Sequence, residues 1–141
     1  ILERLREKES GVYTPNVSLD VQKYPKAHYY FTISFNCSKA NVEKLINAAM
    51  EEVNLFKQNG ATEIDLKKFK SEKLRQEELS LRENSFWLGY LTNRLKYGDD
   101  VNQVLTNTDR INSVTVASSK AAAQKYLNGE NYIRVVLVPE K

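Results

Sequence analysis

The sequence predicts an α+β fold in which helices pack on one face of an antiparallel sheet. Three features of the 141 residues carry this prediction. Residues 16–35 alternate between apolar and polar side chains, residues 38–127 follow helical spacing, and residues 132–138 return to a β-branched run. A chain of this length can bury a core of its own, so we expect residues 1–141 to form a single domain.

The alternating runs predict an antiparallel hairpin with one covered face. In residues 16–22, and again in residues 29–35, apolar side chains fall on one face and polar ones on the other. The turn signal between the two runs contains Pro25. Residues 132–138 are expected to add a third strand to the same sheet. The side chains expected on the covered face of the hairpin are Val17, Leu19, Val21, Tyr29, Phe31, Ile33 and Phe35.

The first predicted helix covers residues 38–59. Ser38 is expected to cap its start, and Gly60 follows it as a stop signal. Its apolar stripe is expected to pack on the sheet, and a fully enclosed Phe56 would make Phe56→Ala cost ~3–5 kcal/mol. The stripe consists of Val42, Leu45, Ala49, Val53 and Phe56.

Capping residues also predict the later helices. Thr62 begins a second long helix, and Asn84 is expected to cap or kink a third that ends at Gly98. An aspartate at position 99 or 100 is expected to cap a short turn over residues 101–105. Thr115 is expected to cap a final helix rich in small residues.

The composition is that of an ordinary globular protein, with 41% hydrophobic and 28% charged residues. The net charge of +3 comes from basic and acidic residues interleaved at helical spacing, which predicts solvated helix faces rather than a nucleic-acid surface. No apolar run is long enough to span a bilayer, so no membrane partner is expected. The chain opens inside a helical pattern without an initiator Met, which indicates a fragment. Its compartment stays open, with a bacterial periplasm or cytoplasm favoured over an organelle.

Residues that commonly bind metals or act as nucleophiles are scarce. His28 and Cys37 are the only histidine and cysteine, and they lie at opposite ends of one predicted strand. A catalytic zinc needs three protein ligands, so neither a metal site nor a catalytic residue is expected in this chain. The serines lack a Gly-x-Ser-x-Gly elbow, and the isolated glycines form no phosphate loop.

The most informative local motif is Leu-Arg-x-x-x-x-Gly-x-Tyr, which runs from Leu5 to Tyr13. A turn at Gly11 can direct the Arg6 guanidinium and the Tyr13 phenol toward one point. Both groups donate hydrogen bonds, and two convergent donors suit a peptide carbonyl or the oxyanion that it becomes.

This motif closely resembles the substrate-binding Arg/Tyr segment in the C-terminal half of pitrilysin-type zinc metallopeptidases. Insulin-degrading enzyme and the mitochondrial processing peptidases belong to that family, whose metal motif is an inverted His-x-x-Glu-His. Residues 40–46, 82–88, 110–115 and 125–139 also resemble its last domain, so the resemblance covers essentially the whole chain. The metal motif itself is absent here.

The resemblance implies a processing-peptidase-like metallohydrolase fold and a two-half enzyme. An N-terminal half, in the same chain or as a separate subunit, would hold zinc, and its Glu would act as general base. The present chain would be the C-terminal domain, which binds no metal, closes over the substrate peptide and is inactive alone. By matching positions, Arg6 and Tyr13 would bind the substrate and support the transition state.

Two other functions stay open at this point. A structural or regulatory subunit of the same fold would be catalytically inactive, and a His-x-x-Glu-His motif in the full open reading frame, or a neighbouring one, would argue against it. A basic nucleic-acid-binding domain is the third possibility, since the eight tyrosines include Tyr29 on an aromatic strand. No basic RNP-like octamer accompanies that strand, so no nucleic-acid partner is expected.

Overall fold

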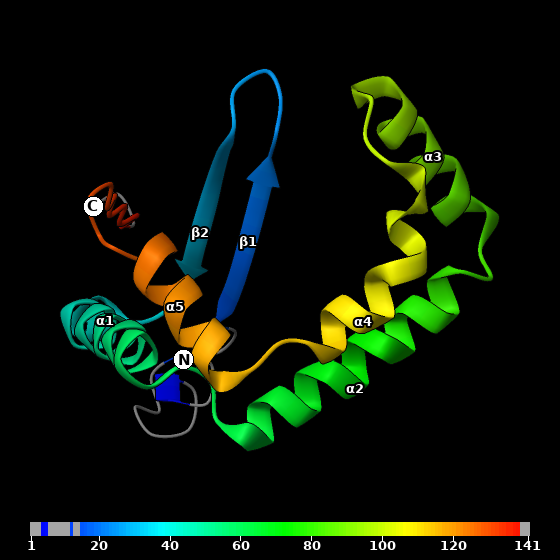
Figure 1. Cartoon of the computed structure of the whole chain (residues 1–141). Helices are drawn as coiled ribbons and strands as arrows, with labels where there is room; N and C mark the ends of the chain where they lie inside the picture. Colours follow the sequence, from blue (N-terminus) through cyan, green and yellow to red (C-terminus); the bar gives the residue numbers. More distant parts are fainter. Residues whose placement is uncertain (1–3, 6–11, 13–14, 139–141) are drawn as a thin grey trace. The chain divides into compact units, whose positions relative to one another are not determined.

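The computed structural model describes residues 4–5, 12 and 15–138, and its chain forms two compact units (Figure 1). The first unit contains residues 1–58 and 121–141, and the second contains residues 59–120. The elements in chain order are β1 (Asn16–Gln22), β2 (His28–Ser34), η2 (Lys39–Asn41), α1 (Val42–Asn59), α2 (Glu63–Ser80), α3 (Asn84–Tyr97), η3 (Val101–Thr106), α4 (Asn107–Asn112) and α5 (Val116–Tyr126). The α+β class predicted from the sequence is confirmed.

Strands β1 and β2 pair antiparallel and form the predicted hairpin. The register places Val17 opposite Ile33 and Leu19 opposite Phe31, so the apolar positions of the two strands share one face. The Tyr24–Pro25 peptide bond in the connecting turn is cis. The alternation of side chains therefore predicted that these two strands pair and that their apolar side chains share one face.

The covered face extends over less of the hairpin than the alternation predicted. On β2, Phe31 and Ile33 are half-buried, as expected. On β1, Leu19 and Val21 are 63% and 69% exposed, so their predicted burial is wrong. The reason is that the described core of this unit meets the hairpin at the Ser34 end of β2, where Ile33 and residues beyond it pack.

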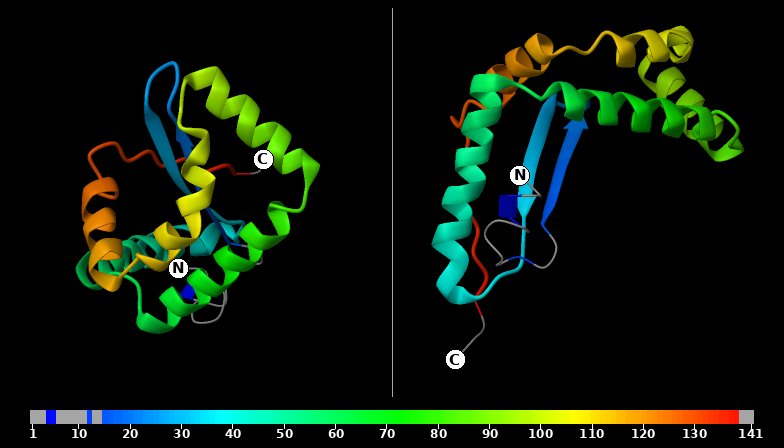
Figure 2. Two further views of the ribbon diagram at one scale, coloured as in Figure 1. Left: turned by 45° about the vertical axis from the view of Figure 1, so that its right-hand side comes forward. Right: turned by 90° about the horizontal axis from the view of Figure 1, so that it is seen from below.

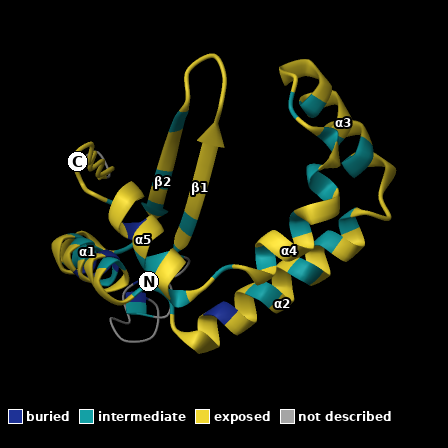
Figure 3. Cartoon of the chain, viewed as in Figure 1, coloured by how far each residue is buried: buried dark blue, intermediate teal, exposed yellow. Residues whose placement is uncertain are grey.

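Helix α1 carries the core of the first unit. Its residues Leu45, Ala48 and Ala49 form one cluster with the buried side chains of Leu5 and Val12. Three half-buried side chains pack against that cluster, namely Ile33, Phe35 and Cys37. Figure 3 shows buried segments of this unit, in dark blue, on α1 and on α5. The buried residues of α1 are Leu45, Ala48, Ala49 and Val53.

The predicted stripe of α1 is correct in its middle and wrong at its end. Leu45, Ala49 and Val53 are buried and Val42 is half-buried, whereas Phe56 is 36% exposed. The core cluster includes Leu45, Ala48 and Ala49, in the first half of the helix, and does not reach its last turn. The large cost expected for Phe56→Ala therefore does not apply, because that cost requires an enclosed ring.

Residues 132–138 do not form the predicted third strand. They have no regular secondary structure, and Leu137 is 94% exposed. Strand preference of β-branched residues reflects packing on a half-buried pleated surface, so it needs a neighbouring strand. Among the described residues, neither β1 nor β2 pairs with this segment.

The C-terminal segment is instead attached to α1 by an ion pair. The Arg134 guanidinium donates to both carboxylate oxygens of Glu43, and Figure 2 shows the segment (red) running beside α1. The hydrogen bond from Arg134 holds the pKa of the Glu43 carboxyl below its ordinary value; desolvation opposes this lowering, and the charge of Arg134 reinforces it.

Acidification should therefore release this segment from α1. A carboxyl with a depressed folded-state pKa stabilises the contact above its unfolded pKa, about 4.3 for glutamate, and stops doing so as the pH falls through the folded pKa. An NMR pH titration of the backbone amides of residues 132–138 should show this transition. Glu43→Gln should remove it, whereas the control Glu130→Gln should retain it. A titration curve unchanged by Glu43→Gln would contradict this assignment.

The predicted caps of the second unit are mostly confirmed. Thr62 Oγ1 accepts a hydrogen bond from the Asp65 backbone N–H at 3.1 Å, and Thr115 Oγ1 accepts from that of Ser118 at 3.1 Å. Asp100, rather than Asp99, caps η3 by accepting from the Asn102 N–H. By contrast, Asn84 is the first residue of α3 rather than its cap. In the first unit, Ser38 precedes the 3-10 turn η2 without a side-chain capping bond.

Gly60 is required by the turn into α2. Its φ of 76° lies in the left-handed region, and a Cβ there would come within 2.7 Å of the Val116 carbonyl oxygen. The next residue, Ala61, donates its N–H to Ser119 Oγ at 2.9 Å. This turn thus packs directly on the first turn of α5. None of the helices that the structure describes is both long and apolar enough to cross a membrane.

Candidate functional site

The two predicted substrate-binding residues, Arg6 and Tyr13, lie outside the described residues. Their convergence therefore stays a prediction. The structure does describe the residue that precedes each of them in the chain. Leu5 is fully buried and Val12 is 8% exposed, and both belong to the core cluster of α1.

The two potential metal ligands serve local structure. The His28 ring lies with Nδ1 2.7 Å from the Lys26 carbonyl oxygen and meets Tyr30 edge to face. Cys37 is half-buried and packs against the core cluster. Within residues 4–5, 12 and 15–138, no three His, Cys, Asp or Glu side chains gather as a metal site.

The aromatic strand of the nucleic-acid interpretation takes part in packing. The Tyr29 hydroxyl donates to the Tyr126 carbonyl oxygen at 2.8 Å, and the two rings meet edge to face. Further along, Ile33 and Phe35 pack against the core cluster. These contacts link the hairpin to α5 and to the core cluster of α1.

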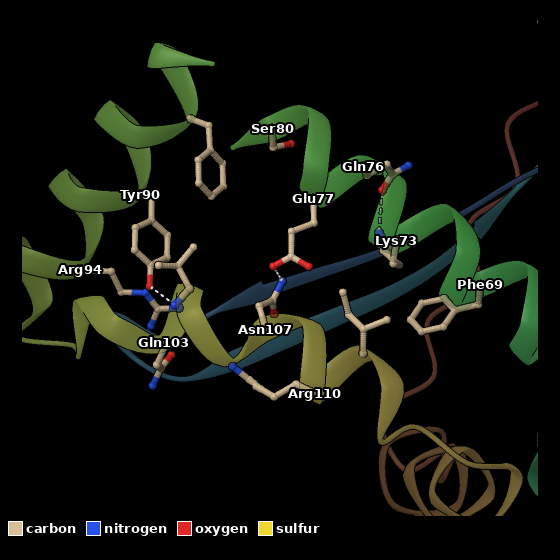
Figure 4. Close-up of a pocket in the computed structure, with 13 residues that line it drawn as sticks. Phe69, Lys73, Gln76, Glu77, Ser80, Tyr90, Arg94, Gln103, Asn107 and Arg110 are labelled. Atoms are coloured by element: carbon tan, nitrogen blue, oxygen red, sulfur yellow. Dashed lines mark hydrogen bonds between the residues drawn. The ribbon is translucent and has the colours of Figure 1, made fainter. Parts of the chain in front are cut away.

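A concave site lies within the second unit. Helices α2, α3 and α4 and the turn η3 enclose a hollow of about 330 Å³, which we call the α2–α4 hollow (Figure 4). The sequence analysis did not find it. Its lining residues are Phe69, Lys73, Gln76, Glu77, Ser80, Phe86, Tyr90, Arg94, Gln103, Val104, Asn107, Arg110 and Ile111.

One wall of the hollow is aromatic and firmly held. Phe86 and Tyr90 stack with ring centroids 5.7 Å apart and planes inclined by 17°. The Tyr90 hydroxyl donates to the Val101 carbonyl oxygen and accepts from the Val104 N–H, each at 3.0 Å. Because the hydroxyl is bonded in both directions, the ring joins α3 to η3 and has a defined orientation.

Polar contacts at both ends of α4 fix it against α2. The Glu77 carboxylate accepts from Asn107 Nδ2 at 2.8 Å and from Thr108 Oγ1 at 3.4 Å. At the other end, Lys70 Nζ donates to the Asn112 carbonyl oxygen at 2.8 Å. The negative Glu77 lies at the start of α4, where backbone N–H groups are unpaired, and the positive Lys70 lies at its end, where backbone carbonyl groups are unpaired. The carboxylate of Glu77 therefore has a structural role, because it joins α2 to the first turn of α4.

The charged side chains of the hollow are mainly basic. Lys73, Arg94 and Arg110 line it, and Glu77 is the one acidic lining residue. Arg94 forms an ion pair with Asp99 at 3.5 Å and lies over the Tyr90 ring. Lys73 Nζ donates to Gln76 Oε1 at 3.3 Å. An anionic group that enters the hollow would therefore meet more positive than negative charge.

Comparison with known proteins identifies the family of this chain. Residues 1–73 match the family model described as the peptidase M16 inactive domain. The chain belongs to this family. The resemblance to the C-terminal domain of pitrilysin-type metallopeptidases, first noted at Arg6 and Tyr13, is thus confirmed.

A solved structure confirms the fold of this M16 inactive domain. The crystal structure of the periplasmic protease PqqL from Escherichia coli superimposes with a TM-score of 0.74 at 21% sequence identity. The alignment covers 90% of this chain and 14% of the PqqL chain, so this chain spans a small part of that protein's length. A comparison with curated proteins finds no match.

The α2–α4 hollow lies mostly beyond the part matched to the family model. Of its lining residues, Phe69 and Lys73 fall within residues 1–73, and the others follow. The match instead includes the Arg6 and Tyr13 segment, the hairpin and α1.

Proposed function

We propose that this chain is the C-terminal, non-metal domain of a zinc-dependent endopeptidase, where it closes the chamber and contacts the substrate peptide. The match of residues 1–73 to the peptidase M16 inactive domain carries the proposal. An N-terminal half, in the same chain or as a separate subunit, is the partner that would bind zinc. The structurally similar PqqL is a periplasmic protease, which supports the periplasm among the compartments left open.

The proposed contact residues are Arg6 and Tyr13. Zinc in the N-terminal half would activate a water molecule, with a Glu of that half as general base. The Arg6 guanidinium then holds the peptide backbone through its planar fork of donors. The Tyr13 phenol donates to the oxygen on which negative charge develops. The burial of Leu5 and Val12 in the core of α1 supports this role, since it anchors the chain next to each residue.

The test compares the complete protein, a version that lacks residues 1–141, and the chain alone. The complete protein should retain stoichiometric zinc after dialysis against a weak chelator and cleave peptides. The truncated version should retain the zinc, which reports a folded N-terminal half, but lose cleavage. The chain alone should retain no zinc and cleave nothing, because three convergent ligands are required.

The same experiment separates the second candidate function, an inactive structural or regulatory subunit. That function predicts a complete protein without zinc or cleavage. Zinc retained by residues 1–141 alone would contradict both functions. Full cleavage by the truncated version would show that this domain neither closes the chamber nor contacts the substrate.

A further inference from the structure

We propose that the α2–α4 hollow binds a segment of the substrate peptide in which a carboxylate side chain lies next to an aromatic one. This inference rests on the proposed function in one respect, namely that the ligand is a peptide. It assigns a second contact site, separate from Arg6 and Tyr13, and gives the site a preference for acidic sequences.

The charge of the lining supports the carboxylate. Among the described residues, no carboxylate forms an ion pair with Lys73 or Arg110, although both side chains line the hollow. Glu77, the one acidic lining residue, directs its two oxygens to Asn107 and Thr108, and no ion pair joins it to either cation among the described residues. A carboxylate between the two cations would gain charge-assisted hydrogen bonds.

The apolar lining supports the neighbouring aromatic side chain. Phe86 and Tyr90 form the stacked wall, and Phe69, which is 40% exposed, contributes a further ring. Val104 and Ile111 complete the apolar surface of the hollow. An aromatic side chain can pack against these rings in stacked or edge-to-face geometry while its own apolar area leaves water.

Size and rigidity favour a peptide segment over a larger partner. The volume of about 330 Å³ is at the lower end of the range typical of small-ligand sites, roughly 300–1,000 Å³, and holds a few side chains. Figure 4 shows Tyr90 of α3, Glu77 of α2 and Asn107 of α4 pointing into this space, while Lys73 is directed to Gln76 along α2. Tyr90 fixes one wall and Glu77 joins the two others, so little ordering is needed when the ligand binds.

The experiment titrates the whole chain with two short fluorescent peptides that differ at one position, one with Glu-Phe and one with Gln-Phe. The Glu peptide should bind roughly fivefold more tightly, as expected for exposed ion pairs of modest strength. Raising the salt concentration should reduce this difference, because screening weakens exposed charges. The double substitution of Lys73→Gln with Arg110→Gln should abolish it.

The control is Arg75→Gln, which removes an exposed positive charge from α2 outside the hollow. This variant should keep the preference for the Glu peptide. Thermal melting should be the same for all charge variants, since Lys73 and Arg110 are exposed and their replacement opens no cavity. Phe86→Leu should weaken the binding of both peptides, because it removes the stacked wall.

The outcomes distinguish this inference from the proposed function. Equal binding of the two peptides, or a preference that survives in the double variant, would overturn the acidic site and leave peptide contact standing. A chain that binds neither peptide would overturn the site and contradict peptide contact as well.

Discussion

If the proposed function is correct, replacing Tyr13 by phenylalanine in the complete protein should lower kcat by about 10²–10³ with little change in KM. The substitution removes the phenol donor and keeps the ring. A hydrogen bond made only in the transition state affects the chemical step and not the binding of the substrate. Steady-state kinetics on a peptide substrate, with zinc content measured in parallel, would give both parameters.

Two further variants test the assignment. Arg6→Lys should impair both kcat and KM, because an ammonium cannot reproduce the planar fork that spans a peptide backbone. Tyr30→Phe is the matched control, since Tyr30 is 61% exposed on β2 and should change neither parameter. A rise in KM at unchanged kcat in Tyr13→Phe would mean that the phenol contacts the peptide only in the ground state.

Replacing Leu45 by alanine should lower the free energy of unfolding by about 2–5 kcal/mol. Leu45 is fully buried at the centre of the core cluster, where it packs with Leu5 and the alanines of α1. Its truncation loses the transfer free energy of the side chain and leaves a cavity that rigid neighbours fill only in part. Urea unfolding of the chain, with an unchanged m value, would measure the loss.

The matched control lies on the same helix. Leu55 is 45% exposed, so Leu55→Ala makes the same chemical change at a position that buries much less area. It should cost well under half as much as Leu45→Ala, because the hydrophobic contribution scales with the area removed from water. Equal losses for the two variants would contradict the core described for α1.

The candidate sites show how far sequence reasoning reached. Arg6 and Tyr13 belong to a short contiguous motif, so they could be recognised as a possible site, and the family that they indicate is correct. The α2–α4 hollow was missed because Lys73 and Arg110 are far apart in the chain and each alone looks like an ordinary solvated helix charge. Only the pairing of α2 with α4, through Glu77 and Asn107, brings them to one hollow.

The sequence by itself determined the family of this protein and most of its local elements. The β1–β2 hairpin, the caps at Thr62 and Thr115, and a cap at Asp99 or Asp100 followed from short-range patterns, because hairpin pairing and capping bonds involve residues close in the chain. The helical spacing of α1 also predicted most of its buried face.

The tertiary structure alone decided which of the apolar surfaces are covered. Leu19, Phe56 and residues 132–138 all have the pattern of buried elements, and all are exposed among the described residues. Periodicity identifies a side chain that can be buried, but burial requires another element to lie over it. That second condition depends on contacts between distant segments, and no local pattern in the chain encodes it.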